Sequence, residues 1–139
     1  MSPLRRQIDG REFDWFAVDS MGHVAHFSSA GFGPIPRQVL ARLEEADDLP
    51  LRLLALPIIG SAKGHMAGRI DDWLEMAKRG LYSFDWSSNR YQLAATPSVA
   101  LHTSALPAEW STAWPVVRLR SVVFAQWQQF DPELYWECD

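Results

Sequence analysis

Residues 14–29, DWFAVDSMGHVAHFSS, place two Asp, two His and three Ser side chains around one Gly. These residue types can form the nucleophile, base and orienting acid of a hydrolase, or can hold a metal ion. The same residues also fit a β-hairpin, because FDWFAV and HVAHFS are typical of strands and DSMG between them is typical of a turn. In that turn Asp19 would bond the backbone ahead of it and Gly22 would take a positive φ.

The hairpin over residues 13–28 limits the chemistry of this stretch. Strand residues at odd spacing point to opposite faces of a sheet, so His23 and His26 are not expected to share a metal ion. We interpret Asp19 and His23 as a local turn contact rather than a catalytic dyad, and His26 as a hydrogen-bonded core or edge histidine. A small hydrolase that uses Asp19, His23 or His26 with a serine stays open as an alternative.

Other catalytic or ligand-binding patterns are weak. GSAKGH, residues 60–65, faintly resembles a phosphate loop but lacks the GxxxxGK[ST] pattern, so we predict a flexible linker there. The sequence has no G-x-S-x-G elbow, no HExxH motif and no Cys/His zinc spacing. We therefore expect no cofactor and no metal site.

The composition is that of an ordinary globular chain of 139 residues, 47% hydrophobic and 22% charged, and we expect one domain over residues 1–139 with residues 1–8 flexible. The formal net charge of -4 argues against a nucleic-acid-binding protein, which usually has a basic face. No apolar run approaches the ~20 residues of a membrane-spanning helix, and nothing resembles a signal peptide. With Cys138 as the one cysteine, we expect a cytoplasmic protein, monomeric or weakly dimeric.

Two helices are predicted from apolar residues at helical spacing. PRQVLARLEEADD, residues 36–48, begins with Pro36 at the favoured first position. HMAGRIDDWLEMAKRG, residues 65–80, has an apolar face and ends at Gly80, a typical C-terminal stop. Between them, LPLRLLALPIIG, residues 49–60, fits either a short buried strand or an extended segment.

The remaining segments favour strands. LYSFDW and RYQLAATP are predicted to pair through SSN, in which Asn89 can take left-handed geometry. PVVRLRSVVFAQW, residues 115–127, alternates as a long strand, and YWECD fits a final edge strand. The elements together predict an α+β fold, with a mostly antiparallel sheet of five or six strands and two main helices packed on one face.

The seven tryptophans are spread along the chain, so we expect most of them to fill a core between sheet and helices. One or two could instead anchor a partner, because tryptophan is enriched at binding hot spots. Trp136 is the first candidate, since it lies in the acidic tail DPELYWECD beside Glu133 and Glu137. Asp19 and His23 complete the candidate binding residues.

The stretch DWFAVDSMGHVAHFSSAGFGPIP, together with WLEMAKRGLYSFDW and a later ALP, resembles small uncharacterised bacterial proteins associated with the immunity partners of toxin systems. The resemblance implies a cytoplasmic bacterial protein and assigns no binding residue. We therefore expect a non-enzymatic binding protein, most concretely an immunity protein that neutralises a toxin partner with a basic surface. A small-ligand sensor with a Trp-lined pocket is the main alternative.

Overall fold

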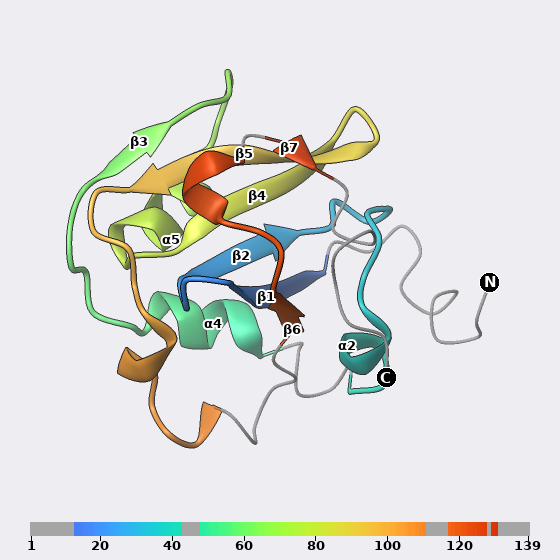
Figure 1. Ribbon diagram of the computed structural model, residues 1–139. Helices are drawn as coiled ribbons and strands as arrows, with labels where there is room; N and C mark the ends of the chain where they lie inside the picture. The colour runs from blue at the N-terminus through green and yellow to red at the C-terminus, as the bar shows by residue number, and fades with distance from the viewer. Residues whose placement is uncertain (1–12, 43–47, 111–116, 128, 131–139) are drawn as a thin grey trace.

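The chain adopts an α+β fold around one mixed sheet, and a computed structural model describes residues 13–42, 48–110, 117–127 and 129–130 (Figure 1). The elements follow in chain order: β1 Asp14–Asp19, β2 Val24–Ser28, α2 Arg37–Leu40, α4 Leu49–Leu54, β3 Ala62–Gly64, α5 Asp71–Lys78, β4 Tyr82–Ser87, β5 Arg90–Pro97, the 3-10 turn η1 Thr103–Ala105, β6 Val117–Leu119, the 3-10 turn η2 Phe124–Gln126 and β7 Gln129–Phe130.

The strand order is β3-β5-β4-β2-β1-β6, and β7 also pairs with β5. The β1–β2, β3–β5, β4–β5 and β5–β7 pairs are antiparallel, whereas β1–β6 and β2–β4 are parallel. The expected α+β class is confirmed, but the expectation of a mostly antiparallel sheet is wrong. The reason is that β2 reaches β4 through a long crossover that carries α2, α4, β3 and α5, and such a crossover makes the pair parallel.

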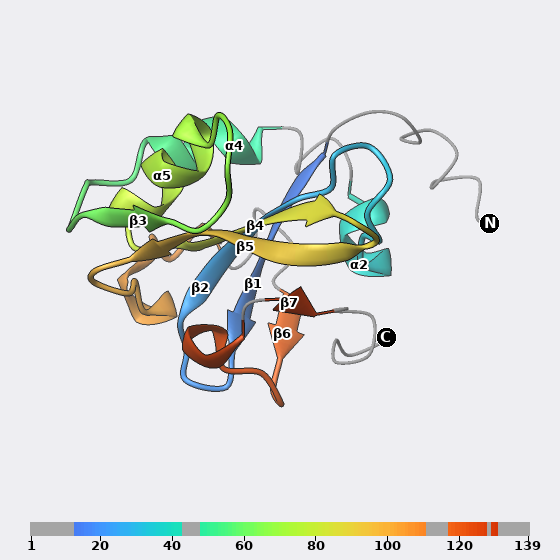
Figure 2. The same ribbon diagram turned by 90° about the horizontal axis from the view of Figure 1, so that it is seen from above.

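The two faces of the sheet bury two separate apolar cores, because side chains alternate along each strand. In β1, Trp15 belongs to the first core and Phe16 to the second. In the first core Trp15 stacks on Phe27 at 4.2 Å between ring centroids, and the buried Phe124 of η2 covers this face. The second core lies under α4 and α5, which Figure 2 shows on the opposite side of the sheet from η2.

The helices differ from the two that were predicted. Three are described, of which α4 and α5 supply the second core and α2 supplies Val39 and Leu40 to the first. Helix α2 ends at Leu40, well before the predicted end at residue 48, and residues 43–47 lie outside the described ranges. Helix α5 begins only at Asp71, after Gly68 with φ +90°.

Residues 49–60 were expected to be a strand or extended, yet they begin with helix α4. Pro50 sits in the first helical turn, where its missing N–H costs no hydrogen bond. Leu49 and Leu53, one turn apart, are both buried in the second core, so tertiary packing selects the helix. The predicted linker at residues 60–65 contains strand β3, which pairs with β5.

The predicted hairpins are confirmed, because their turns are set by local residues. β1 and β2 pair antiparallel around a turn in which Gly22 has φ +80°. β4 and β5 are joined through Ser88 and Asn89 at φ +55° and +62°, as a two-residue hairpin turn requires. The predicted long strand at residues 115–127 is wrong, since β6 spans only Val117–Leu119.

Candidate functional site

Asp19 fastens the β1–β2 turn to a distant part of the chain. Its Oδ1 accepts the backbone N–H groups of Met21 and His23, each at 2.9 Å. Its Oδ2 accepts the N–H of Phe124, also at 2.9 Å, across 105 residues of sequence. Because Asp19 is only 6% exposed and binds backbone donors, the predicted local turn contact with His23 is confirmed.

Gly22 allows the ring of His102 to lie against the turn. A Cβ on Gly22 would lie 2.2 Å from His102 Nε2, so no side chain fits there. His102 Nδ1 accepts the N–H of Ser104 at 3.1 Å, which places the proton of the neutral ring on Nε2. The rings of His23 and His102 lie 6.5 Å apart, and His23 Nδ1 is buried without a hydrogen-bond partner among the described residues.

His26 belongs to a separate set of polar side chains on the helix-covered face. Its Nδ1 lies 3.0 Å from Ser83 Oγ, and its Nε2 lies 3.0 Å from Asp14 Oδ2 in a close but poorly aligned ion-pair geometry. Ser83 is 0% exposed, so a substrate cannot reach this serine in the described fold. The expected hydrogen-bonded core histidine is thus confirmed. Ser83 was missed because the parallel β2–β4 pairing has no local sequence signal, whereas Asp14 lies on the predicted hairpin and its approach to His26 was not recognised.

A polar cleft of about 550 Å³ opens beside the hairpin turn, and we call it the tip cleft. Its walls are the turn at residues 18–22, the pair His102 and Thr103, and the side chains of Arg118 and Arg120. The strand alternation Val117, Arg118, Leu119 buries the two apolar residues and turns the arginine outward. Sequence reasoning named the turn but missed the arginines, because only the parallel β1–β6 pairing brings them there.

A second cavity of about 470 Å³, here called the η2 pocket, lies between β3, β5 and η2. Tyr82, Leu93 and Phe124 contribute apolar surface, and Lys63 and His65 contribute polar groups. His65 Nε2 is hydrogen-bonded to Thr96 Oγ1. Burial and then the positive charge of Lys63 lower the pKa of His65, while burial and then the negative charge of Asp19 raise the pKa of Tyr82. Neither cavity has a tryptophan in its lining, so neither is the Trp-lined pocket of the alternative ligand-sensor hypothesis.

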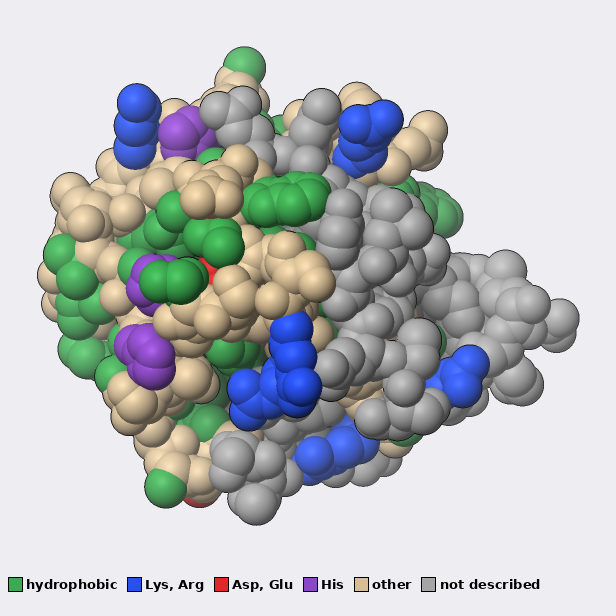
Figure 3. Space-filling view, in the orientation of Figure 1, with side chains coloured by type: hydrophobic (Ala, Val, Ile, Leu, Met, Phe, Trp, Pro, Cys, Tyr) green, Lys and Arg blue, Asp and Glu red, His purple; other side chains and the backbone are tan. Residues whose placement is uncertain are grey.

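Large hydrophobic side chains are exposed along α4 and the segment that follows it. We call this surface the apolar edge and define it by Leu51, Leu54, Ile58, Ile59 and Val99. Val99 lies beside Gly60, which follows Ile59, since its Cγ2 is 3.3 Å from the position that a Cβ on Gly60 would take. In Figure 3, hydrophobic side chains line the corresponding left side of the molecule.

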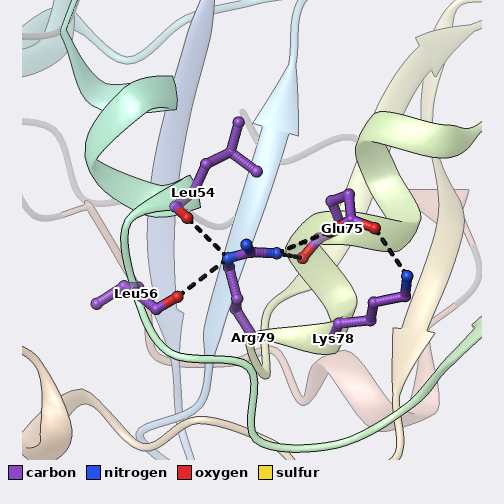
Figure 4. Close-up of polar contacts among 5 residues, drawn as sticks. All are labelled: Leu54, Leu56, Glu75, Lys78 and Arg79. Carbon is purple, nitrogen blue, oxygen red and sulfur yellow. Dashed lines mark hydrogen bonds and ion pairs between the residues drawn. The ribbon is translucent and has the colours of Figure 1, made fainter.

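Arg79 holds the apolar edge against α5 (Figure 4). Its Nε donates to the carbonyl oxygens of Leu54 and Leu56 at 2.9 and 3.0 Å, and its Nη1 donates to the carbonyl oxygen of Glu75 at 2.8 Å. Glu75 also pairs with Arg79 and Lys78, and these hydrogen bonds lower the pKa of the Glu75 carboxyl. The backbone that carries the edge is therefore fixed by a planar, multiply bonded guanidinium.

The charge of the described residues differs from that of the whole chain. Ten of the 13 Lys and Arg residues, but only eight of the 17 Asp and Glu residues, lie in the described ranges, so this part carries a formal charge of +2. The face in Figure 3 accordingly displays Lys, Arg and His side chains and almost no Asp or Glu. The chain's acidic excess lies in the remaining segments, which include Glu133, Trp136 and Glu137 of the predicted binding tail. Those three predicted residues lie outside the described ranges.

The described tryptophans mostly fill the cores, as expected. Trp15 and Trp110 are buried, and Trp86 and Trp127 pack against the first core. Trp73 on α5 is half-buried. Packing in the cores thus accounts for most of the described tryptophans. The exposed large apolar side chains of the edge are aliphatic.

No protein-family model, curated protein sequence or solved structure matches this chain. Within the described ranges, no three His, Cys, Asp or Glu side chains gather as ligands for a metal ion. The helices described here include none long and apolar enough to cross a membrane. The two cavities and the apolar edge are therefore the candidate functional features of the described residues.

Proposed function

We propose that this chain is a non-enzymatic protein-binding module and that the apolar edge is its interface. The observation that supports this is the exposure of large aliphatic side chains on one stretch of surface: Leu51 is 70% exposed, Ile58 57% and Val99 50%. Contiguous exposed apolar surface is typical of protein interaction sites, because a partner removes it from water. Isolated surface leucines would need no such explanation.

The anchoring of the edge also favours binding. Arg79 fixes the carbonyls of Leu54 and Leu56, and Ser61 and Ser98 exchange hydrogen bonds of 2.8 and 2.9 Å at its other end. A surface whose backbone is already ordered loses less conformational entropy when a partner binds. The apolar edge is therefore better suited to a partner than a loop that must first become ordered.

The concrete form of this proposal is an immunity protein that neutralises a bacterial toxin. It is supported by the sequence resemblance and by the two acidic runs of the sequence, EEADD at residues 44–48 and DPELYWECD at residues 131–139. Acidic residues such as Glu133 and Glu137 would steer a partner with a basic surface, and Trp136 would add an aromatic anchor. Apolar contact at the edge would then supply most of the affinity.

The test is co-expression with the products of the genes that flank the gene for this chain, each of which is first expressed alone and assayed for toxicity. We expect growth to be restored and a complex to be purified. Ile58→Asp should weaken the complex at least about tenfold, because it places an unpaired charge in an apolar contact. Phe32→Asp is the matched control, since Phe32 is 68% exposed but lies outside the apolar edge.

Each outcome of this test is decisive for one part of the proposal. If neither rescue nor a complex is seen, the immunity function is wrong. Rescue with equal loss of affinity in both aspartate variants, or in neither, would exclude the apolar edge as the interface. A variant that combines Trp136→Ala with Glu133→Gln and Glu137→Gln tests the tail, and full affinity in that variant would remove it from the interface.

A second candidate function, small-molecule binding, is favoured by the η2 pocket, whose volume of about 470 Å³ falls in the usual range for ligand sites. Ala62→Trp, at a half-buried position of its wall, would fill the pocket. A small molecule found in a thermal-shift screen should lose its stabilising effect in this variant. A hit that stabilises the variant equally would place that ligand elsewhere.

A further inference from the structure

The tip cleft has the chemistry of an oxyanion site, separate from the apolar edge. We infer that it binds a small molecule through a phosphate monoester group, held by Arg118 and by the Nε2–H of His102. This inference does not depend on the proposed protein-binding function, because the two surfaces share no residue.

The side chains around the cleft present hydrogen-bond donors and positive charge. Arg118 lines it with an exposed guanidinium, which offers paired N–H groups that match phosphate oxygens. His102 adds a donor, since its Nδ1 is occupied by the N–H of Ser104 and the proton of the neutral ring is on Nε2. The hydroxyls of Ser20 and Thr103 can donate as well.

The one carboxylate in the lining does not oppose an anion in the way that a free carboxylate would. Both oxygens of Asp19 accept backbone N–H groups, from Met21 and His23 on one side and from Phe124 on the other. These N–H dipoles offset part of its negative charge, and both oxygens point to backbone donors of the fold. No other Asp or Glu lines this cleft among the described residues.

The backbone of the turn and of η1 is fixed before a ligand arrives. Gly22 N–H donates to the Asp19 carbonyl at 3.1 Å, and Thr103 N–H donates to the Gly22 carbonyl at 2.8 Å, which ties the hairpin turn to η1. The His102 ring lies against Gly22, and its Nδ1 is held by the N–H and the hydroxyl of Ser104. The backbone that carries the turn and η1 therefore needs no ordering when an anion binds, whereas the exposed Arg118 side chain becomes ordered at that moment.

Phosphate is favoured over carboxylate because donors surround the cleft from three chain segments, the turn, η1 and β6. A carboxylate has two oxygens and is satisfied by one guanidinium, whereas a phosphate monoester presents three terminal oxygens to donors in different directions. The cleft volume of about 550 Å³ also leaves room for the organic group of the ester beside the donors that would hold the phosphate.

The experiment is calorimetric titration of the full chain at a fixed ionic strength of about 0.15 M, where weak long-range attraction is screened. The probes are phenyl phosphate, inorganic phosphate and benzoate. We expect phenyl phosphate and inorganic phosphate to saturate one site and benzoate to bind at least about tenfold more weakly. Arg118→Gln should weaken phenyl phosphate binding at least about tenfold, because a charge-assisted hydrogen bond is lost.

Arg90→Gln is the matched control, because it removes an exposed arginine at the far β4–β5 hairpin and should change the affinity less than about twofold. Unchanged melting temperature in both variants separates loss of binding from loss of folding. In the NMR spectrum, the ring protons of His102 should shift on titration with phenyl phosphate. Absence of saturation, equal binding of benzoate, or equal effects of the two arginine variants would each overturn the inference.

Discussion

Replacement of Asp19 by alanine should destabilise the fold more than the replacement of any exposed residue of the hairpin. The carboxylate accepts the N–H groups of Met21, His23 and Phe124, each at 2.9 Å, and is 6% exposed. A hydrogen bond to a charged group contributes about 1.5–3 kcal/mol, and a buried donor left without a partner costs about 1–3 kcal/mol. Met21 and His23 lie near the surface, where water can accept part of the hydrogen bonding that their N–H groups lose when the carboxylate is removed.

These contributions add to about 3–5 kcal/mol for Asp19→Ala, a large part of the ~5–15 kcal/mol that stabilises a typical domain. Asp19→Asn should cost less, about 1–3 kcal/mol, because one oxygen remains while the amide group opposes one N–H donor. Urea unfolding followed by tryptophan fluorescence measures both values. Ser20→Ala is the control, since Ser20 is exposed in the same turn and should change stability by less than about 0.5 kcal/mol. A loss below about 1 kcal/mol for Asp19→Ala would refute the reasoning, because it would mean that the donors are satisfied without the carboxylate.

Three further predictions concern single side chains. Gly22→Val should lower stability by at least about 1 kcal/mol, because of its φ of +80° and its contact with His102, and an unchanged melting temperature would contradict this. His26→Leu should cost about 1–3 kcal/mol by leaving Ser83 Oγ buried without its partner, and adding Ser83→Ala should recover part of that loss in urea unfolding. The pKa of Glu75 is lowered by hydrogen bonds from Lys78 and Arg79, so its contribution to stability is present above its ordinary value of 4.5 and is lost as pH falls through the lowered value. Glu75→Gln should therefore flatten the acid limb of a pH–melting-temperature curve, and an unchanged limb would show that the ion pairs do not couple to folding.

The parts of the fold that sequence predicts correctly are those that local residues decide. The turn signal around Gly22 and the αL residues at Ser88 and Asn89 act within a few positions, so both hairpins could be predicted. Helix α4 could not, because Leu49 and Leu53 become helical through burial under the second core rather than through a strong local pattern. The parallel pairings of β1 with β6 and of β2 with β4 join residues far apart in sequence, and alternation of apolar residues does not reveal which strands will be neighbours.

The contacts of the candidate site likewise fall into those that local sequence predicts and those that depend on tertiary structure. The turn contact between Asp19 and His23 could be predicted, because an aspartate at the start of a turn commonly binds the next backbone N–H groups. The contact of Asp19 with Phe124, and the approach of Arg118 to the turn, depend on tertiary structure. Of the set formed by Asp14, His26 and Ser83, only the buried, hydrogen-bonded state of His26 could be predicted, because no local pattern indicates that Ser83 of β4 lies beside it.

The course of the chain also has a consequence for synthesis on the ribosome. β1 is among the first elements to emerge, but its parallel neighbour β6 and the Phe124 donor for Asp19 follow about a hundred residues later. Until residues 117–130 leave the exit tunnel, one edge of β1 has no partner and the first core has no cover over Phe27 and Phe84. Unpaired edges and uncovered apolar faces promote association between incomplete chains. Nascent chains that end before residue 117 should therefore depend on chaperones. Residues 117–130 complete the sheet, and the domain can fold fully only after they have emerged.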